Sequence, residues 1–251
     1  TDRVSVLRDG QYIGTVTTKE VEMCEAISLM VGREVSSDAR PRTEVTSDEV
    51  VLKVEGLATR KLLRDISFEI REGEFLGFAG LMGPGARRWP AASSVLIRAP
   101  RAIWIRGKKA AINTAADAVR NGIGYLSEDR KQFGLLLEQN IRQNAAMAAM
   151  KDLDIGGFTL DGRILIFDEP TRGIDVGAKE ETYELLEQLC GQGKAILMIS
   201  SELPEALRMN HRIAVVTHGR ITGFLDDEEA IRENIMELAI VGKAQLKGNA
   251  A

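Results

Sequence analysis

The sequence predicts an α/β protein with a three-layer core, and three observations carry this prediction. Segments of strand and helix character alternate along most of the chain, as they do in proteins built around a parallel sheet. Residues 163–167, RILIF, form a continuous apolar run, which is typical of a strand buried on both faces. A second apolar run, residues 75–80, leads directly into a glycine-rich loop, GLMGPG.

The predicted elements follow one another from residue 49 onward. Apolar residues concentrate in the strand segments, and segment 140–150 is rich in Ala and Met, as expected of a helix. The predicted strands cover residues 50–57, 66–70, 75–80, 122–126, 163–167 and 195–200, and residues 103–107 are predicted to form a further strand and turn. The predicted helices cover residues 115–121, 140–150, 179–192 and 203–209.

A repeat predicts two unequal domains. Residues 3–14, RVSVLRDGQYIG, and residues 212–223, RIAVVTHGRITG, share one apolar alternation and their glycines at a constant offset of 209. Each copy predicts two short strands around a turn, followed by an acidic helical segment. The chain also begins without Met, inside this alternation. We therefore expect residues 1–35 to be the end of a first domain, 36–44 a linker and 45–251 a second domain.

Composition excludes several classes of protein. The 251-residue chain has 33 basic and 37 acidic residues, so its net charge of -4 provides no basic field for nucleic acid. Cys24 and Cys190 lack metal-ligand spacing, which favours reduced thiols in the cytosol over a zinc site or a disulfide. No apolar run is long enough to span a bilayer, so we expect any membrane role to come through a partner.

The strongest chemical signal is the pair of acids in RILIFDEPTRGIDVG. Asp168 and Glu169 end an apolar strand, which places them at the sheet edge where open α/β proteins bind ligands. Two adjacent carboxylates there need a cation. In a nucleotide site the first would orient Mg²⁺ and the second would polarise the water that attacks the γ-phosphate. The alternative is that Asp-Glu-Pro only caps the following helix.

The glycine loop predicts a matching phosphate site. Gly80 and Gly85 have the spacing of a phosphate-binding loop between a strand and a helix, with Gly83 between them. The next residues are Ala86 and Arg87, where such loops have Lys and Ser or Thr. Arg87 can reach phosphate, but its planar fork is not equivalent to an ammonium group, and nothing replaces the hydroxyl. A simple strand-to-helix turn is the alternative.

Four ordered motifs resemble one family. GLMGPG, GIGYLSEDRK, LIFDEPTRGIDVGAK and LMISSELPEAL are similar to the C-terminal half of the duplicated ATP-binding subunit of ABC-type monosaccharide importers of the ribose, galactose and xylose class. The resemblance implies a P-loop NTPase core of ABC type with an antiparallel β subdomain, binding ATP and Mg²⁺. It also implies a cytosolic ATPase on the inner face of the plasma membrane, paired head to tail with another nucleotide-binding domain and driving a membrane permease.

The resemblance implies roles for individual residues. Asp168 matches the acid that orients Mg²⁺, and Glu169 matches the catalytic glutamate. Asp175 matches the loop that crosses to the partner domain. Glu128 stands where most ABC proteins have a glutamine that senses the metal and the permease.

Two further residues match the family's switch segment. Ser201 and Glu202 stand where most ABC proteins have a histidine, and we assign them catalytic roles on this resemblance. For Glu128 and Glu202 the alternative is an exposed helix-cap or surface acid.

The chain departs from the family in two places. Residues 86–101, ARRWPAASSVLIRAPR, replace an Arg-Thr-Glu sequence and an amphipathic helix, through either a local frameshift or divergence. Residues 151–162 stand where the family has a helical subdomain and its Leu-Ser-Gly-Gly signature. These departures favour a second hypothesis, a catalytically silent remnant with a structural role. A chromosome-maintenance ATPase would need coiled-coil heptads, which the sequence lacks.

Overall fold

The computed structural model of this chain has two layers of strands and a layer of helices. The structure describes residues 2–8, 11–17, 29, 44–45, 47–58, 63–80, 102–128, 138–140, 142, 163–226 and 228–248. The helix predicted over residues 140–150 lies almost wholly outside these ranges.

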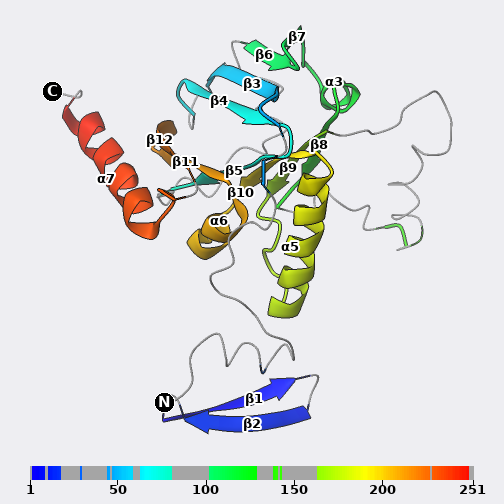
Figure 1. The fold of residues 1–251 in the computed structure, drawn as a ribbon, viewed down its shortest axis with the longest axis vertical. Coiled ribbons are helices and arrows are strands. Elements are labelled where there is room, and N and C mark those ends of the chain that lie inside the picture. The colour runs from blue at the N-terminus through cyan, green and yellow to red at the C-terminus, as the bar shows by residue number, and fades with distance from the viewer. Residues whose placement is uncertain are drawn as a thin grey trace.

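The central layer is a six-stranded sheet (Figure 1). Its strands are β5 (Phe75–Ala79), β8 (Ile123–Leu126), β9 (Ile164–Asp168), β10 (Ala195–Ile199), β11 (Arg212–Thr217) and β12 (Arg220–Asp226). They lie in the order β12-β11-β5-β10-β9-β8. All neighbours from β11 to β8 are parallel, and β12 pairs antiparallel with β11 at one edge. The predicted parallel sheet is therefore confirmed.

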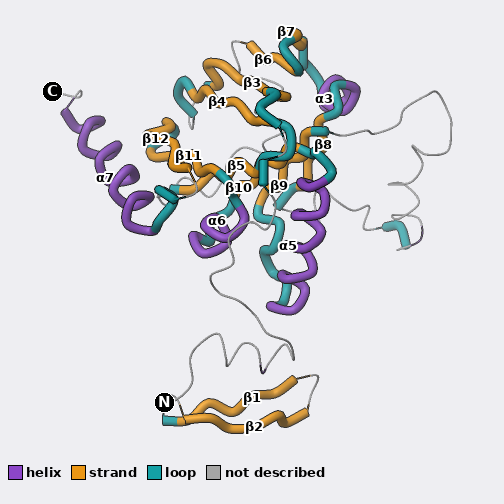
Figure 2. Tube along the Cα trace, in the orientation of Figure 1, coloured by secondary structure: helices purple, strands orange, loops and turns teal. Residues whose placement is uncertain are grey.

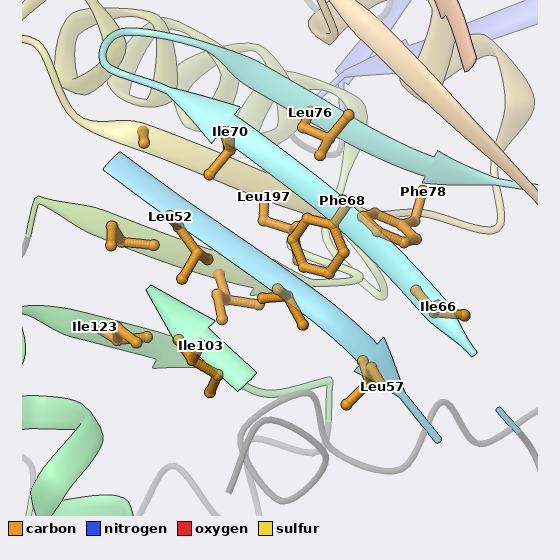
Figure 3. Close-up of a cluster of buried hydrophobic side chains, with 14 of the residues drawn as sticks. Leu52, Leu57, Ile66, Phe68, Ile70, Leu76, Phe78, Ile103, Ile123 and Leu197 are labelled. Carbon is orange, nitrogen blue, oxygen red and sulfur yellow. The ribbon is translucent and has the colours of Figure 1, made fainter. Parts of the chain in front are cut away.

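A smaller antiparallel sheet covers one face of the central sheet. Its strands are β3 (Val50–Leu57), β4 (Ile66–Arg71), β6 (Ala102–Ile105) and β7 (Lys108–Ala110), in the order β4-β3-β6-β7. The two sheets share one apolar core, in which Phe68 of β4 and Phe78 of β5 pack edge to face with ring centroids 5.2 Å apart (Figure 3). The antiparallel subdomain thus extends the hydrophobic core of the parallel sheet.

Helices cover the opposite face of the central sheet (Figure 1 and Figure 2). They are α5 (Val176–Gly191), α6 (Leu203–Met209) and α7 (Arg232–Gly248). A fourth, α3 (Ala115–Arg120), contacts the edge strand β8 and begins with a capping box made by Thr114 and Asp117. Cys190 of α5 is a buried free thiol, as predicted, whereas Cys24 lies outside the described residues.

Alternation along β10 explains why the sheet can be covered on both sides. All five residues of this strand are buried. Ala195, Leu197 and Ile199 point into the core shared with the antiparallel sheet, whereas Ile196 and Met198 pack against α5. Because successive strand residues face opposite sides, a continuous apolar run is what two covered faces require.

The helix after the acidic strand begins earlier than predicted. α5 starts at Val176, three residues before the predicted start at Lys179, because Asp175 is its N-cap. The Asp175 Oδ1 atom accepts a hydrogen bond of 2.9 Å from the Ala178 N–H. A capping aspartate satisfies one of the unpaired N–H groups of the first turn, so residues 176–178 can already be helical.

The N-terminal hairpin repeats a detail of the second hairpin. It consists of β1 (Arg3–Arg8) and β2 (Gln11–Thr17), which pair antiparallel. Its register shifts between Val6 and Leu7, and the β11–β12 register shifts between Val215 and Val216, the same offset of 209 as in the sequence repeat. The two copies therefore share an irregularity as well as an apolar pattern.

None of the helices in the described ranges is long and apolar enough to cross a membrane.

Candidate functional site

The two predicted acids lie at the carboxyl edge of the parallel sheet. Asp168 is the last residue of β9, beside Ile199 at the end of β10. Glu169 leaves the sheet with a φ of +50°, and its N–H donates to the Ile199 carbonyl over 2.8 Å. A non-glycine residue in the left-handed region is uncommon and is held there only by its surroundings. The structure therefore fixes the direction in which the chain leaves β9.

Asp168 is a buried carboxylate with a defined neighbour. Its side chain is 6% exposed, and the hydroxyl of Tyr125 on β8 donates to its Oδ2 atom over 3.0 Å. Burial raises the pKa of Asp168, and the bond from Tyr125 offsets part of this effect. Tyr125 thereby orients the acid that the sequence assigns to Mg²⁺.

Glu169 is held by the neighbouring loop. The backbone N–H of Ser201, just beyond β10, donates to its Oε1 atom over 2.7 Å. Burial raises the pKa of Glu169, the hydrogen bonds from Ser201 lower it, and the charges of Glu205 and Asp168 raise it again. Ser201 therefore positions this carboxylate through both its backbone N–H and its side chain.

The raised pKa values have a definite consequence for stability. A carboxyl whose pKa is higher in the folded than in the unfolded chain favours folding below its unfolded pKa, and this contribution is lost as the pH rises through the folded pKa. Ionised Asp168 and Glu169 thus cost folding free energy at neutral pH. A cation beside them would favour the ionised carboxylates and offset that cost.

The donor set fits Mg²⁺. Both acids offer hard oxygen ligands, and Mg²⁺ in nucleotide sites is bound by one or two carboxylates with phosphate oxygens and water completing the octahedron. Within the described ranges no group of three or more His, Cys, Asp or Glu side chains gathers as a separate metal cage. Asp168, the acid predicted to orient the metal, is therefore suited to a Mg²⁺ ion that arrives with phosphates, with Glu169 beside it.

Ser201 and Glu202 point to different partners. Ser201 contacts Glu169, whereas the Glu202 carboxylate accepts two hydrogen bonds, of 3.0 and 2.8 Å, from Nζ of Lys179 on α5. The Glu202 side chain is about half exposed in this ion pair. Of the two residues in the predicted switch segment, only Ser201 touches the predicted catalytic acid.

Glu128 links two loops at the same edge of the sheet. It lies two residues after β8 and forms an ion pair with Arg172, which follows β9. The Arg172 side chain is largely exposed and that of Glu128 is one-third exposed. Glu128 is thus close to the acidic loop, in a partly solvated position.

Gly80 is the member of the glycine loop that the structure describes. Its φ is +152°, and a Cβ atom there would lie 2.1 Å from the Val216 carbonyl oxygen. Gly83, Gly85, Ala86 and Arg87 lie outside the described residues, as do the segments 86–101 and 151–162. Glycine is therefore required at the start of the loop by contact with β11, whatever the loop binds.

Asp175 gives a first testable prediction, because its capping role can be separated from any role in binding. Asp175→Ala should lower the free energy of unfolding by about 1 kcal/mol, the usual cost of losing an N-cap. Asp175→Asn should stay near wild type, since Asn caps helices equally well. Urea unfolding followed by circular dichroism measures both. Equal stability of the two variants would show that the cap contributes nothing.

Sequence reasoning did not assign roles to four residues of this region: Tyr125, Thr171, Ser200 and Glu205. Each lies in or beside a quoted motif, yet none has a recognisable spacing of its own. A usable signal was present for Ser200, a polar residue directly after an apolar strand at the edge where Asp168 lies. Thr171 and Glu205 could be found only from the contact between the loop after β9 and α6.

The fold is that of an ATP-binding cassette. The structure superimposes on cbiO1 from Clostridium perfringens, part of the ABC transporter complex cbiONQ, with a TM-score of 0.52 and 20% identity, covering 79% of this chain and 96% of that one. It also matches an ATP-binding cassette of an ABC transporter in its ADP conformation, with a TM-score of 0.55 and 12% identity, over 76% of this chain and 98% of that one. The predicted parallel sheet with an antiparallel β subdomain is the cassette fold.

Sequence relatives identify the family more closely. The chain is 42% identical over 287 residues to a putative ribose/galactose/methyl galactoside import ATP-binding protein of Burkholderia cenocepacia, which covers 95% of this chain and 56% of that protein. It is 37% identical to the ribose import ATP-binding protein RbsA of Geobacillus kaustophilus, covering 96% of this chain and 58% of that one. No family model matches the chain. The chain belongs to the family of ribose/galactose import ATP-binding proteins of ABC transporters.

The chain spans about half the length of these curated relatives. The aligned region of 287 residues is also longer than the whole chain of 251, so the relatives contain residues within it that have no counterpart here.

Proposed function

We propose that this chain is the ATP-binding and ATP-hydrolysing part of a carbohydrate ABC importer, coupling nucleotide hydrolysis to sugar uptake. One observation carries the proposal: the adjacent acids Asp168 and Glu169 lie at the carboxyl edge of a cassette sheet, with Glu169 oriented by the Ser201 N–H. The identity to sugar-import ATP-binding proteins supports the substrate class. The partners would be permease subunits at the inner face of the plasma membrane and a second nucleotide-binding domain.

Each residue of the edge has a step in the proposed mechanism. Asp168, held by Tyr125, would bind the hydration shell of Mg²⁺, which when bound neutralises charge on the transferring phosphoryl group. Glu169, oriented by Ser201, would accept a hydrogen bond from the attacking water and take its proton at the carboxylate. Gly80 and the loop that follows would present backbone N–H groups to the phosphates. Asp175 would face the partner domain.

The domain division is part of the same proposal. Residues 1–35 would be the end of a first nucleotide-binding domain, 36–44 a linker and 45–251 a second, shortened domain. The register shift that recurs at Val6 and Val215 supports the duplication, since a bulge is a specific feature of a hairpin. The residues that the relatives have and this chain lacks support a reduced helical subdomain.

The reduced length also favours a second candidate function, a structural domain that no longer hydrolyses ATP. The sequence has Ala86 and Arg87 where a phosphate loop has Lys and a hydroxyl residue, and residues 151–162 contain no signature motif. Binding separates the two candidates. Calorimetry that detects no ATP affinity at millimolar nucleotide and Mg²⁺ would contradict the first and support the second.

Glu169→Gln tests the hydrolytic role. Loss of the carboxylate base should reduce Mg-ATP turnover by about 100-fold or more, the usual contribution of a general base, while nucleotide binding persists. Glu181→Gln is the matched control, because it makes the same charge change at an exposed position of α5. Phosphate release by the purified chain measures both. Equal turnover in wild type and Glu169→Gln would assign the activity to another site.

A further inference from the structure

A buried carboxylate behind the proposed catalytic edge has no role in the mechanism given above. Glu205 of α6 is 3% exposed. Its Oε1 atom accepts a hydrogen bond of 2.6 Å from the Thr171 hydroxyl, and its Oε2 atom accepts one of 2.5 Å from the Ser200 hydroxyl. Both donors are themselves buried, Thr171 at 1% and Ser200 at 3% exposure. A buried charge is costly, so two short charge-assisted bonds to it are needed in the folded state.

The two donors come from the two loops that hold Glu169. Thr171 lies two residues after Glu169, in the turn closed by the Arg172 N–H on the Glu169 carbonyl. Ser200 directly precedes Ser201, whose N–H holds the Glu169 carboxylate. Ser200 Oγ also accepts a 3.0 Å hydrogen bond from the Glu202 N–H, which fixes the backbone on the far side of Ser201. One carboxylate therefore ties both sides of the Glu169–Ser201 contact.

A third hydroxyl completes the environment of Glu205. Tyr183 of α5 is 5% exposed and hydrogen-bonded to both Glu205 and Thr171. Burial and the charge of Glu205 raise the pKa of Tyr183, so its phenol remains protonated and able to donate. Its position is further set by Arg208, whose guanidinium lies 4.6 Å from the ring centroid.

We propose that Glu205 is a positioning residue: through Thr171 and Ser200 it clamps the loops after β9 and β10 together, so that the Ser201 N–H meets the Glu169 carboxylate. Its kinetic consequence rests on the function proposed above. The carboxylate itself touches neither of the acids that would meet Mg-ATP, and acts through the backbone of its two partners. This gives a reason for a charged residue buried on α6.

Thr171→Val tests the clamp without changing side-chain volume. It removes one hydroxyl donor to Glu205, and Thr171→Ser, which keeps the hydroxyl, is the rescue variant. Thr182→Val is the matched control, because the Thr182 hydroxyl donates only to the Ala178 carbonyl within α5. Hydrogen exchange resolved by NMR is read at the Ser201 amide, with the Leu197 amide of the buried strand β10 as internal reference.

The expected result is local. In Thr171→Val the Ser201 amide should exchange about tenfold faster relative to Leu197, whereas Thr171→Ser and Thr182→Val should stay near wild type. An unchanged ratio of Ser201 to Leu197 exchange in Thr171→Val would overturn the proposal. The loss of amide protection would then be absent or shared by the whole fold. A ratio raised equally by Thr182→Val would overturn it as well.

Kinetics give an independent reading that separates this inference from the proposed function. If the chain hydrolyses Mg-ATP, Thr171→Val should lower kcat about tenfold with KM unchanged, and it should add no further loss to Glu169→Gln. A rise in KM with kcat unchanged would contradict the clamp. Absence of nucleotide binding in wild type would contradict the proposed function, and the amide measurement would still decide whether Glu205 sets the Ser201–Glu169 contact.

Discussion

Gly80→Ala is expected to destabilise the fold by more than about 4 kcal/mol, a large part of the stability of a typical domain. The added Cβ would lie 2.1 Å from the Val216 carbonyl oxygen, and that oxygen belongs to the backbone of β11, which is paired with β12 on one side and β5 on the other. A backbone atom held by neighbouring strands cannot move aside as a side chain can. The φ of +152° adds strain for any residue with a Cβ.

Gly107→Ala is the matched control for this prediction. Gly107 also has a positive φ, +72°, but nothing lies within 4 Å of its Cβ position. It should therefore cost only about 1–2 kcal/mol, the strain of a left-handed alanine. Urea midpoints of the two variants measure the difference. If Gly80→Ala unfolds at the same urea concentration as Gly107→Ala, the contact with β11 is not a rigid one, and glycine at position 80 serves the loop alone.

Arg212→Met should cost about 3–5 kcal/mol, because it leaves a buried carboxylate without its cation. Glu74 is 1% exposed, and its Oε1 atom accepts a 2.8 Å hydrogen bond from Arg212 Nε. Arg212 also donates from Nη2 to the Glu69 carbonyl over 2.7 Å. Since Glu69 belongs to β4 and Arg212 to β11, this arginine joins the antiparallel sheet to the central one.

Two further variants make the Arg212 prediction specific. Lys53→Met removes an exposed ion pair with Glu55, whose side chains are 47% and 44% exposed, and should cost less than about 1 kcal/mol. The double variant Glu74→Gln with Arg212→Met should recover part of the loss, since no unpaired charge is then buried. Thermal and urea unfolding measure all three. A single Arg212→Met as stable as Lys53→Met would show that the buried Glu74 carboxylate does not depend on this cation.

The strands and their burial could largely be predicted from local pattern. The run at 163–167 predicts a strand covered on both faces, and β9 is packed between the antiparallel sheet and α5 as expected. The start of α5 lies three residues before its predicted position, because it depends on a side-chain cap at Asp175 and not on apolar periodicity. The order of strands in the sheet has no local signal, since β5 pairs with β10 and β11 from distant parts of the chain.

The sequence by itself determined the family, the position of Asp168 and Glu169 at the end of an apolar strand, and the hairpin repeat, because each is written in consecutive residues. Tertiary structure alone decided which groups hold those acids. Tyr125, Ser201 and Glu205 belong to separate parts of the fold. Each is 32 to 43 residues away in the sequence from its hydrogen-bond partner, which is Asp168, Glu169 or Thr171, respectively. They meet because the carboxyl ends of neighbouring parallel strands converge at one edge, and no periodicity along the chain records which strands are neighbours.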